Sequence, residues 1–498
     1  MGVEAKLVLV SNRGSYNLKE INGKVEAVPA ISGLVSAVEP VLREKGGVWV
    51  AWGGREATAP DAPALRIMVP PENPSYCFCE VPLTAEEIKL YYHGFTNGAL
   101  WPLCHYFLEK CRYNPLEWEV YRQVNVKFAL ATLAEAKPQD TVWVNDYHLA
   151  LVPAILRQHR PELRQVFFWH IPFPHYDLFA TLPWARAVLR GLLGSDIIAF
   201  HLPDYSYNFL QAVNKLLEVP VDYTTFSIKW DGRRIIAPAW PMGIDVDAFQ
   251  KLACDVKIRQ QAEELRRQIG TERIALAVER LDYTKGILER LLAFERFLEE
   301  NPEWLGRLAL VQVAVPCRTG VTAYQQLRSQ VEEAVGRING RFSEGNYRPV
   351  HYFWRGLPRQ ELVAYYLAAD LMWVTPLRDG LNLVAKEYVA SRVDGTGILI
   401  LSRFAGAARE LKEAVIINPY DIEGTVAALK AALAMPVSQQ RHRLRRLQEQ
   451  VRRHDIQWWL TNFQRALKER EVKEDESLRR PLRLGNYGSI SSPGFIDV

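Results

Sequence analysis

The chain has 498 residues, of which 48% are hydrophobic and 24% charged, and its formal net charge is only +4. This length exceeds one ordinary core and predicts two large domains or three small ones. The weak positive balance does not favour nucleic-acid binding. No signal-peptide pattern opens the sequence, and no stretch reaches the ~20 apolar residues of a membrane helix. Six cysteines without zinc-finger spacing indicate reduced thiols. We therefore expect a soluble cytoplasmic protein without a metal site.

Short apolar runs alternate with helical patterns along most of the chain. Runs that are apolar at consecutive positions are typical of strands buried on both faces of a parallel sheet. In the first half these runs cover 7–10, 48–52, 141–144, 166–169 and 196–200, and in the second half 273–278, 308–315, 371–375, 397–401 and 414–418. The alternation predicts an α/β protein with doubly wound domains.

A segment suited to a linker divides this alternation. Residues 241–245 read PMGID, and the strand–helix pattern restarts near 272. We predict an N-terminal Rossmann-like domain over 1–243 and a C-terminal one over 244–454, facing each other across a cleft. The basic stretch 439–454 carries a narrow apolar stripe, which is typical of a solvated helix. Beyond it we predict a terminal helix over about 455–468 that docks back, then a poorly ordered tail over 469–498.

Two motifs of the second half could bind a phosphorylated ligand. After the strand 273–278, Arg280 offers a planar fork of donors and Lys285 a compact charge, so both could converge on one diphosphate, although surface cations are common. After the strand 371–375, Asn382 is suited to capping a helix whose free N–H groups would face an anion. Asp379 could accept hydrogen bonds from sugar hydroxyls and Glu387 could bind a ribose. A plain capped helix is the alternative.

Polar and aromatic residues also follow strands of the first half. Asp146 and His170 each come directly after a buried strand, at the edge where open α/β sheets bind ligands. A single histidine there is more often structural, but the pairing with Asp146 favours a ligand contact. Aromatic rings can cover the apolar face of a sugar while a guanidinium holds its phosphate. Residues of these types are Arg13, Trp52, Tyr92, Trp101 and Arg318, although core packing explains most single aromatic residues.

Three familiar motifs are missing from the sequence. No G-x-G-x-x-G follows the first predicted strand, and no phosphate-binding loop ends in Gly-Lys-Ser/Thr. These absences argue against a dehydrogenase and a kinase. No G-x-S-x-G is present either, which argues against a common hydrolase.

Taken together, the segments resemble the trehalose-6-phosphate synthases, retaining glycosyltransferases of the GT-B type with two facing Rossmann-like domains. The matching stretches run in the family's order from Ser11 to about Phe463 and are SNR, YYHGFTNGALWP, NDYHLALVPA, HIPFP, VERLDYTKG, RINGRF, TPLRDGLNLVAKEYVA and LSRFAGAARELKEAVIINPYD. The resemblance implies glucosyl transfer to glucose 6-phosphate from a nucleotide-glucose, UDP-glucose before ADP-glucose. It also implies no cofactor, no nucleic-acid or membrane partner, and a possible homo-oligomer.

The resemblance further implies a role for each site residue. The donor site it implies consists of Gly33, Arg280, Lys285, Asp379, Asn382, Leu383, Val384 and Glu387. The acceptor site it implies consists of Arg13, Trp52, Tyr92, Trp101, Asp146 and Arg318, with the two arginines on the acceptor phosphate. The catalytic residues it implies are His170, Arg280, Lys285 and Asp379.

The resemblance leaves some choices open. It implies attack on the face from which the diphosphate departs, with that phosphate taking the acceptor's proton. One alternative is a glucosylglycerol-phosphate synthase, which uses ADP-glucose and glycerol 3-phosphate, and the intact Arg13 and Arg318 argue against it. Another is a catalytically silent sugar-phosphate sensor, against which the intact donor residues argue. The family's usual residues are replaced at Ser32, Asn145, Gly320 and Arg403, which leaves the donor base and fine acceptor preference open.

Overall fold

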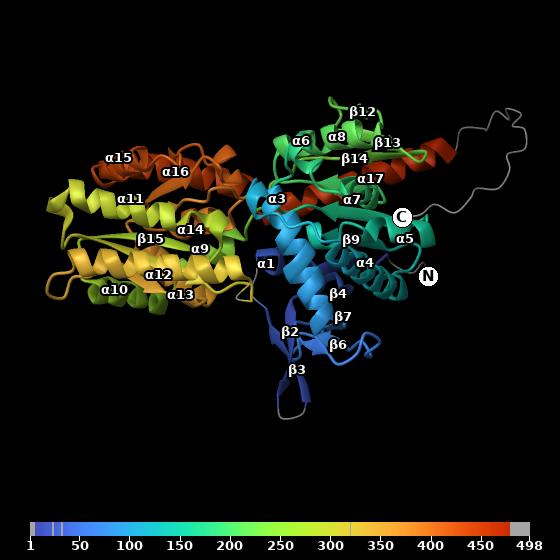
Figure 1. Cartoon of the computed structure of the whole chain (residues 1–498), viewed down its shortest axis with the longest axis horizontal. Coiled ribbons are helices and arrows are strands. Elements are labelled where there is room, and N and C mark those ends of the chain that lie inside the picture. Colours follow the sequence, from blue (N-terminus) through green and yellow to red (C-terminus); the bar gives the residue numbers. More distant parts are fainter. Residues whose placement is uncertain (1–4, 22–23, 31–32, 319, 479–498) are drawn as a thin grey trace, which may run out of the picture.

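The computed structural model describes residues 5–21, 24–30, 33–318 and 320–478. These residues form two lobes side by side, each built around a largely parallel sheet covered by helices (Figure 1). The predicted α/β class with two doubly wound sheets is confirmed. No helix in these ranges is long and apolar enough to cross a bilayer.

The N-terminal lobe is built on a sheet whose centre is parallel and whose edges are antiparallel. Within the described residues its strands are, in spatial order, β12 (Val221–Asp222), β13 (Ser227–Trp230), β14 (Arg233–Ile236), β11 (Ile197–Ala199), β10 (Arg164–Phe168), β9 (Thr141–Asn145), β1 (Leu7–Arg13), β4 (Val48–Trp52), β7 (Tyr76–Glu80) and β6 (Arg66–Val69). The central strands are apolar at consecutive positions because helices cover both faces. The smaller pairs are β2 (Tyr16–Ile21) with β3 (Lys24–Pro29), and β5 (Glu56–Ala57) with β8 (Leu83–Thr84).

The helices of this lobe include one unusual element. They are α1 (Gly33–Lys45), α2 (Ala85–Glu87), α3 (Trp101–Cys104), α4 (Pro115–Glu135), α5 (Val152–His159), α6 (Tyr176–Phe179), α7 (Ala185–Leu192) and α8 (Pro203–Leu217), with short 3-10 turns η2 (Leu108–Lys110) and η3 (Tyr147–Leu149). Between α2 and α3 lies a π-helix, η1 (Ile88–Leu100). This geometry is rare in proteins and is frequently found at functional sites.

The C-terminal lobe has a fully parallel sheet. Its strands in the described ranges are, in spatial order, β17 (Val350–Phe353), β16 (Leu308–Val315), β15 (Arg273–Arg280), β18 (Leu371–Val374), β19 (Ile398–Ser402) and β20 (Val415–Ile417). The helices are α9 (Val246–Cys254), α10 (Val256–Ile269), α11 (Ile287–Glu300), α12 (Thr322–Phe342), α13 (Arg359–Ala368), α14 (Leu383–Ser391), α15 (Ile422–Leu433) and α16 (Val437–Arg453), with short 3-10 turns η4 (Tyr283–Lys285), η5 (Pro302–Trp304) and η6 (Gly406–Arg409). Parallel strands place all their carboxyl ends at one edge, and ligands of such sheets bind there.

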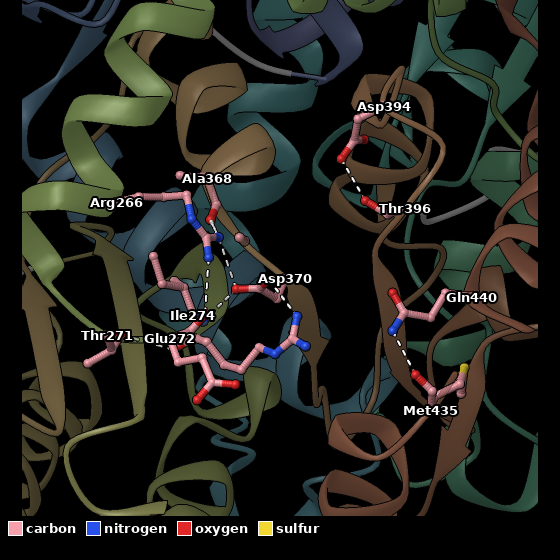
Figure 2. A network of polar contacts seen from close by, with 12 residues as sticks. Arg266, Thr271, Glu272, Ile274, Ala368, Asp370, Asp394, Thr396, Met435 and Gln440 are labelled. Atoms are coloured by element: carbon pink, nitrogen blue, oxygen red, sulfur yellow. Dashed lines mark hydrogen bonds and ion pairs between the residues drawn. The ribbon is translucent and has the colours of Figure 1, made fainter. Parts of the chain in front are cut away.

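The opposite edge of this sheet is closed by charge pairs. Asp370 accepts hydrogen bonds from Arg266 at 2.9 Å, from Arg273 at 3.2 Å and from the amide of Ile274 at 2.8 Å (Figure 2). The contacts tie the carboxyl end of α10 to the amino ends of β15 and β18. The carboxyl ends therefore remain free to face the other lobe.

The last helix, α17 (Ile456–Leu478), crosses from the C-terminal lobe to the N-terminal lobe (Figure 1). Trp459 and Phe463 pack on Trp143 of β9, with ring centroids 5.2 and 4.4 Å away. The helix continues beyond the predicted end at 468, through a segment expected to be a poorly ordered tail. The rest of that predicted tail, 479–498, lies outside the described residues.

Candidate active site

The two lobes meet where the carboxyl ends of both sheets face each other. The backbone of Gly380, after β18, lies so close to the N-terminal lobe that a Cβ there would be 2.6 Å from the His170 carbonyl oxygen. Tyr205 Oη also lies 3.5 Å from the Asp379 carbonyl oxygen across the boundary. Most of the residues expected to bind ligands sit along this boundary.

An ion pair holds the donor side together. Lys285 Nζ lies 2.6 Å from Asp379 Oδ2, and Asn382 Nδ2 donates to the same oxygen at 3.1 Å. Although burial opposes the charged form of Asp379, Lys285 keeps its pKa below the ordinary value. Asp379 is thus ionised, and Lys285 and Asn382 hold its carboxylate in one orientation.

A buried arginine, Arg290, connects the two segments that carry this ion pair. Arg290 is fully buried and donates to the Trp373 carbonyl at 3.0 Å and to Thr375 Oγ1 at 2.8 Å. It also pairs with Glu279 on β15. Thr375 in turn donates to the Gly286 carbonyl at 2.9 Å. The turn carrying Lys285 is therefore tied to the loop carrying Asp379.

Two helices begin close together on the donor side. Asn382 caps α14 by accepting from the Ala385 amide at 3.1 Å, as its residue type predicts. Gly33 begins α1, and a Cβ on it would lie 2.7 Å from Leu383 Cδ1. The two helix starts thus bring backbone N–H groups and partial positive charge to one place, which favours an anion. Further along α14, burial raises the pKa of Glu387, which accepts from Tyr366 Oη at 3.0 Å.

The acceptor side is built around a buried arginine of the C-terminal lobe. Arg318 Nη1 lies 2.8 Å from Asp282 Oδ2, and both side chains are buried. Burial opposes the charge on Asp282, but Arg318, Arg280 and Lys285 together lower its pKa to about 2. Tyr324 bonds to both members of the pair. Arg318 is therefore fully charged and held in one orientation.

Trp101 of the N-terminal lobe lies between two cations of the C-terminal lobe. Its ring is 4.0 Å from the Arg318 guanidinium carbon and 5.1 Å from that of Arg280. Trp101 Nε1 and Arg318 Nε are buried and find no hydrogen-bond partner among the described residues. These two donors are available to a ligand placed between the donor and acceptor sides.

The remaining acceptor candidates form an aromatic wall. The Arg13 guanidinium lies 4.5 Å from the Trp52 ring, and Trp52 lies 6.0 Å from Tyr92. Burial lowers the pKa of Arg13, and Tyr92 acts in the opposite direction. Arg13 Nη2 donates to Asn17 Oδ1 at 2.5 Å, and no contact joins it to Arg318 within the described residues. Two arginines, Arg13 and Arg318, were predicted to bind the acceptor phosphate. Of these, Arg318 lies over the Trp101 ring and Arg13 lies over the Trp52 ring.

Asp146 and His170 lie together at the ends of β9 and β10. Asp146 has a left-handed backbone with φ of 74°, and its Oδ1 accepts from the amides of Tyr147 at 3.0 Å and His170 at 3.2 Å. Burial raises the pKa of Asp146 to about 7. Burial lowers the pKa of His170 to about 3, and its Nε2 lies 3.0 Å from Asn145 Oδ1. His170 is thus a neutral imidazole at physiological pH.

Sequence reasoning missed three residues of this site. Asp282, Tyr324 and Arg290 act on ligand-facing residues through buried contacts. Asp282 stands inside the motif VERLDYTKG, two residues after Arg280, so its position was a usable signal. Arg290 lies in a helix whose pattern looks amphipathic, and nothing in that pattern distinguishes it from a solvated cation. In the described part of the chain, no group of three or more histidine, cysteine or acidic side chains is placed to hold a metal ion.

Comparison with known proteins decides the family. The profile of glycosyltransferase family 20 matches residues 5–469. This chain belongs to glycosyltransferase family 20. It is therefore a glycosyltransferase, and its resemblance to the trehalose-6-phosphate synthases is confirmed. It is 42% identical over 487 residues to the trehalose-6-phosphate synthase of Mycolicibacterium gilvum, a match covering 95% of this chain and 96% of that protein.

Other relatives extend this comparison. The bifunctional trehalose-6-phosphate synthase/phosphatase of Thermoproteus tenax is 41% identical over 478 residues, and the match covers 92% of this family 20 chain but only 63% of that longer protein. Among solved structures, an α,α-trehalose-phosphate synthase (UDP-forming) from Burkholderia xenovorans in complex with glucose 6-phosphate has a TM-score of 0.86 at 34% identity, covering 93% of this chain and 100% of that one. An E. coli structure bound with UDP-2-fluoro glucose has a TM-score of 0.85 at 32% identity, covering 93% and 99%.

Proposed function

We propose that the chain transfers glucose from UDP-glucose to glucose 6-phosphate, with retention at the transferred carbon, to give α,α-trehalose 6-phosphate and UDP. The observation that carries this proposal is the placement of Arg280 and Arg318 over one ring, that of Trp101. Two separate cations converging from the same lobe suit two phosphorylated substrates that must meet. The names of the relatives support the same reaction.

The donor diphosphate would lie between Arg280, Lys285 and the two helix starts. Positive charge fixed around the leaving group stabilises the transition state without reorganisation, which is the largest contribution in many enzymes. Glu387 would accept a hydrogen bond from the ribose, and Asp379 from the glucose. The preference for uridine is supported by the UDP-forming relative and by the relative bound with UDP-2-fluoro glucose.

The acceptor would place its phosphate on Arg318 and its sugar ring against the aromatic wall of Trp52 and Tyr92. Asp146, with a pKa of about 7, would accept the hydrogen bond of the attacking hydroxyl and orient it. His170, as a neutral imidazole, would contact the donor sugar without adding charge. Arg13 would reach the phosphate by exchanging its contact with Asn17 for the ligand.

The chemical step follows from these positions. The bond between the glucose anomeric carbon and the diphosphate oxygen breaks, while the acceptor hydroxyl oxygen bonds to that carbon on the same face. The acceptor's proton passes to the departing phosphate oxygen, so charge and atoms balance. Asp379 would not serve as a nucleophile in this step, because Lys285 and Asn382 hold its carboxylate. We propose that the reaction needs no metal ion, since the protein cations perform the usual task of the metal.

The test is nucleoside diphosphate release with each pair of substrates. UDP-glucose and ADP-glucose are combined with glucose 6-phosphate or glycerol 3-phosphate, in buffer with EDTA and in buffer with Mg²⁺. We expect release with UDP-glucose and glucose 6-phosphate at equal rates in both buffers, and we expect the product to be α,α-linked by NMR. Release only with glycerol 3-phosphate would assign the chain to the osmolyte branch. No release with any pair would refute the proposal in favour of a sensor.

A further inference from the structure

A pocket with several charged residues in its lining lies beside the proposed acceptor site, on a different face of η1. It holds about 410 Å³, within the range of roughly 300–1,000 Å³ typical of small-molecule sites. One wall comes from η1 and the start of α4 in the N-terminal lobe, and the other from Tyr283, Tyr324 and the first residues of α12 in the C-terminal lobe. None of the residues assigned above to donor or acceptor lines it.

Two glycines shape the floor of this pocket. A Cβ on Gly94 would lie 2.7 Å from Glu117 Cδ, and a Cβ on Gly98 would lie 3.2 Å from Arg112 Nη2. Because neither glycine has a side chain, the carboxylate of Glu117 and the guanidinium of Arg112 can approach the backbone of η1 closely.

Two buried polar atoms near these glycines lack hydrogen-bond partners. His93 Nδ1 and Glu117 Oε2 are buried and have no hydrogen-bond partner among the described residues. Two further cations, Lys89 and Lys110, stand at the rim with Arg112. Lys110 Nζ lies 5.3 Å from the Tyr283 ring and 3.9 Å from Glu109, a long and exposed ion pair. Three cations and one carboxylate whose buried oxygen lacks a hydrogen-bond donor thus line the same pocket.

We propose that this pocket is a second site for a sugar phosphate, separate from the acceptor site. Lys89, Lys110 and Arg112 would bind the phosphate, since cations at a pocket rim can reach its several oxygens. Glu117 would accept a hydrogen bond from a sugar hydroxyl, which supplies the donor it lacks. The ring of Tyr283 would lie along the sugar. A bare anion would leave Glu117 without a donor, so these contacts favour a ligand that carries both a phosphate and a hydroxyl group.

The pocket also touches residues that hold the acceptor site. Its Tyr324 bonds to Arg318 and Asp282, and its Asn97 accepts from Tyr147, whose hydroxyl lies 3.5 Å from Arg318 Nη2. A ligand contacting both walls favours the arrangement of lobes in which Arg318 meets Trp101. This expectation rests on the proposed function: a ligand bound in the pocket should lower the KM for the acceptor. By reciprocity, a bound acceptor should tighten ligand binding in the pocket.

Isothermal titration of the full chain with glucose 6-phosphate tests the proposal. We expect two classes of site per chain. Lys110→Ala combined with Arg112→Ala should weaken one class about tenfold or more, because two charge-assisted contacts are lost. Arg318→Ala should remove the other class and, through the reciprocal coupling, weaken the pocket class by less than the pocket variant does. The matched control is Arg441→Ala with Arg445→Ala, which removes equal charge from exposed positions of α16 and should leave both classes intact.

Each outcome separates the two ideas. One class only, lost in Arg318→Ala and kept in the pocket variant, would overturn the second site. Loss of the pocket class with no class sensitive to Arg318 would support the pocket and count against the proposed function. Inorganic phosphate is titrated as a second probe. Binding as tight as that of glucose 6-phosphate, with the same sensitivity to Lys110 and Arg112, would overturn the assignment to a sugar phosphate.

Discussion

Replacing Asp282 by asparagine removes the charge that faces Arg318 while keeping the shape of the side chain. Asp282 is fully buried and accepts from Arg318 at 2.8 Å, from Tyr324 at 3.1 Å and from the Thr284 amide at 3.0 Å. Its pKa is about 2 against an ordinary 3.8. Each pKa unit is worth about 1.4 kcal/mol, so the site favours the charged form by roughly 2.5 kcal/mol.

We expect Asp282→Asn to lose about that stability at neutral pH and to weaken acceptor binding. Arg318 would then carry a buried charge without its partner and would no longer be held over Trp101, so the acceptor KM should rise about tenfold or more. The donor KM should stay near its original value. Because the pKa of Asp282 is depressed in the folded state, its contribution is complete above about pH 4 and is lost as the pH falls toward 2.

Thermal unfolding and initial rates of nucleoside diphosphate release measure the two effects. The matched control is Asp370→Asn, which removes a carboxylate that pairs with Arg266 and Arg273 at the opposite end of the same sheet (Figure 2). We expect the control to lower the unfolding midpoint without changing the acceptor KM. An unchanged acceptor KM in Asp282→Asn, or an equal rise in both KM values, would refute the positioning role of Asp282.

Three further predictions follow from single residues. Burial raises the pKa of Asp146 to about 7, so kcat/KM for the acceptor should rise as the pH increases through about 7. Asp146→Asn should abolish this pH-dependent rise and lower the rate ~100-fold. An unaltered pH profile in the variant would contradict the proposed role of Asp146 in orienting the acceptor hydroxyl. Arg290→Met should lower the free energy of unfolding by about 3–5 kcal/mol, because Glu279 is left buried without its cation. Thermal unfolding should therefore show a lower midpoint, and a midpoint equal to that of the parent would contradict this reasoning. Gly33→Val should raise the donor KM severalfold and leave the acceptor KM unchanged, because its Cβ would collide with Leu383 and separate the two helix starts; an acceptor-specific effect would contradict the assignment.

Much of the fold could be predicted because the buried strands are apolar at consecutive positions. The bounds of β4 and β16 match the predicted runs 48–52 and 308–315. Strands at the antiparallel edges, such as β13 and β14, were not predicted because one face meets solvent and the pattern is short and mixed. The π-helix was not predicted either, since its side-chain pattern resembles no standard period.

Part of the candidate site could also be predicted from the sequence, and part could not. Residue type and position after a strand were enough to single out Lys285, Asp379 and Asn382, because parallel strands bring their carboxyl ends to one edge whatever the details. The sequence alone also determined the α/β class and, through eight ordered stretches, the resemblance to a family. What only the tertiary structure decided is which charges face one another: Arg318 with Asp282, and Arg290 with Glu279. The members of each pair lie on different structural elements, and their energies depend on burial and direction, which are set when the sheets and helices pack.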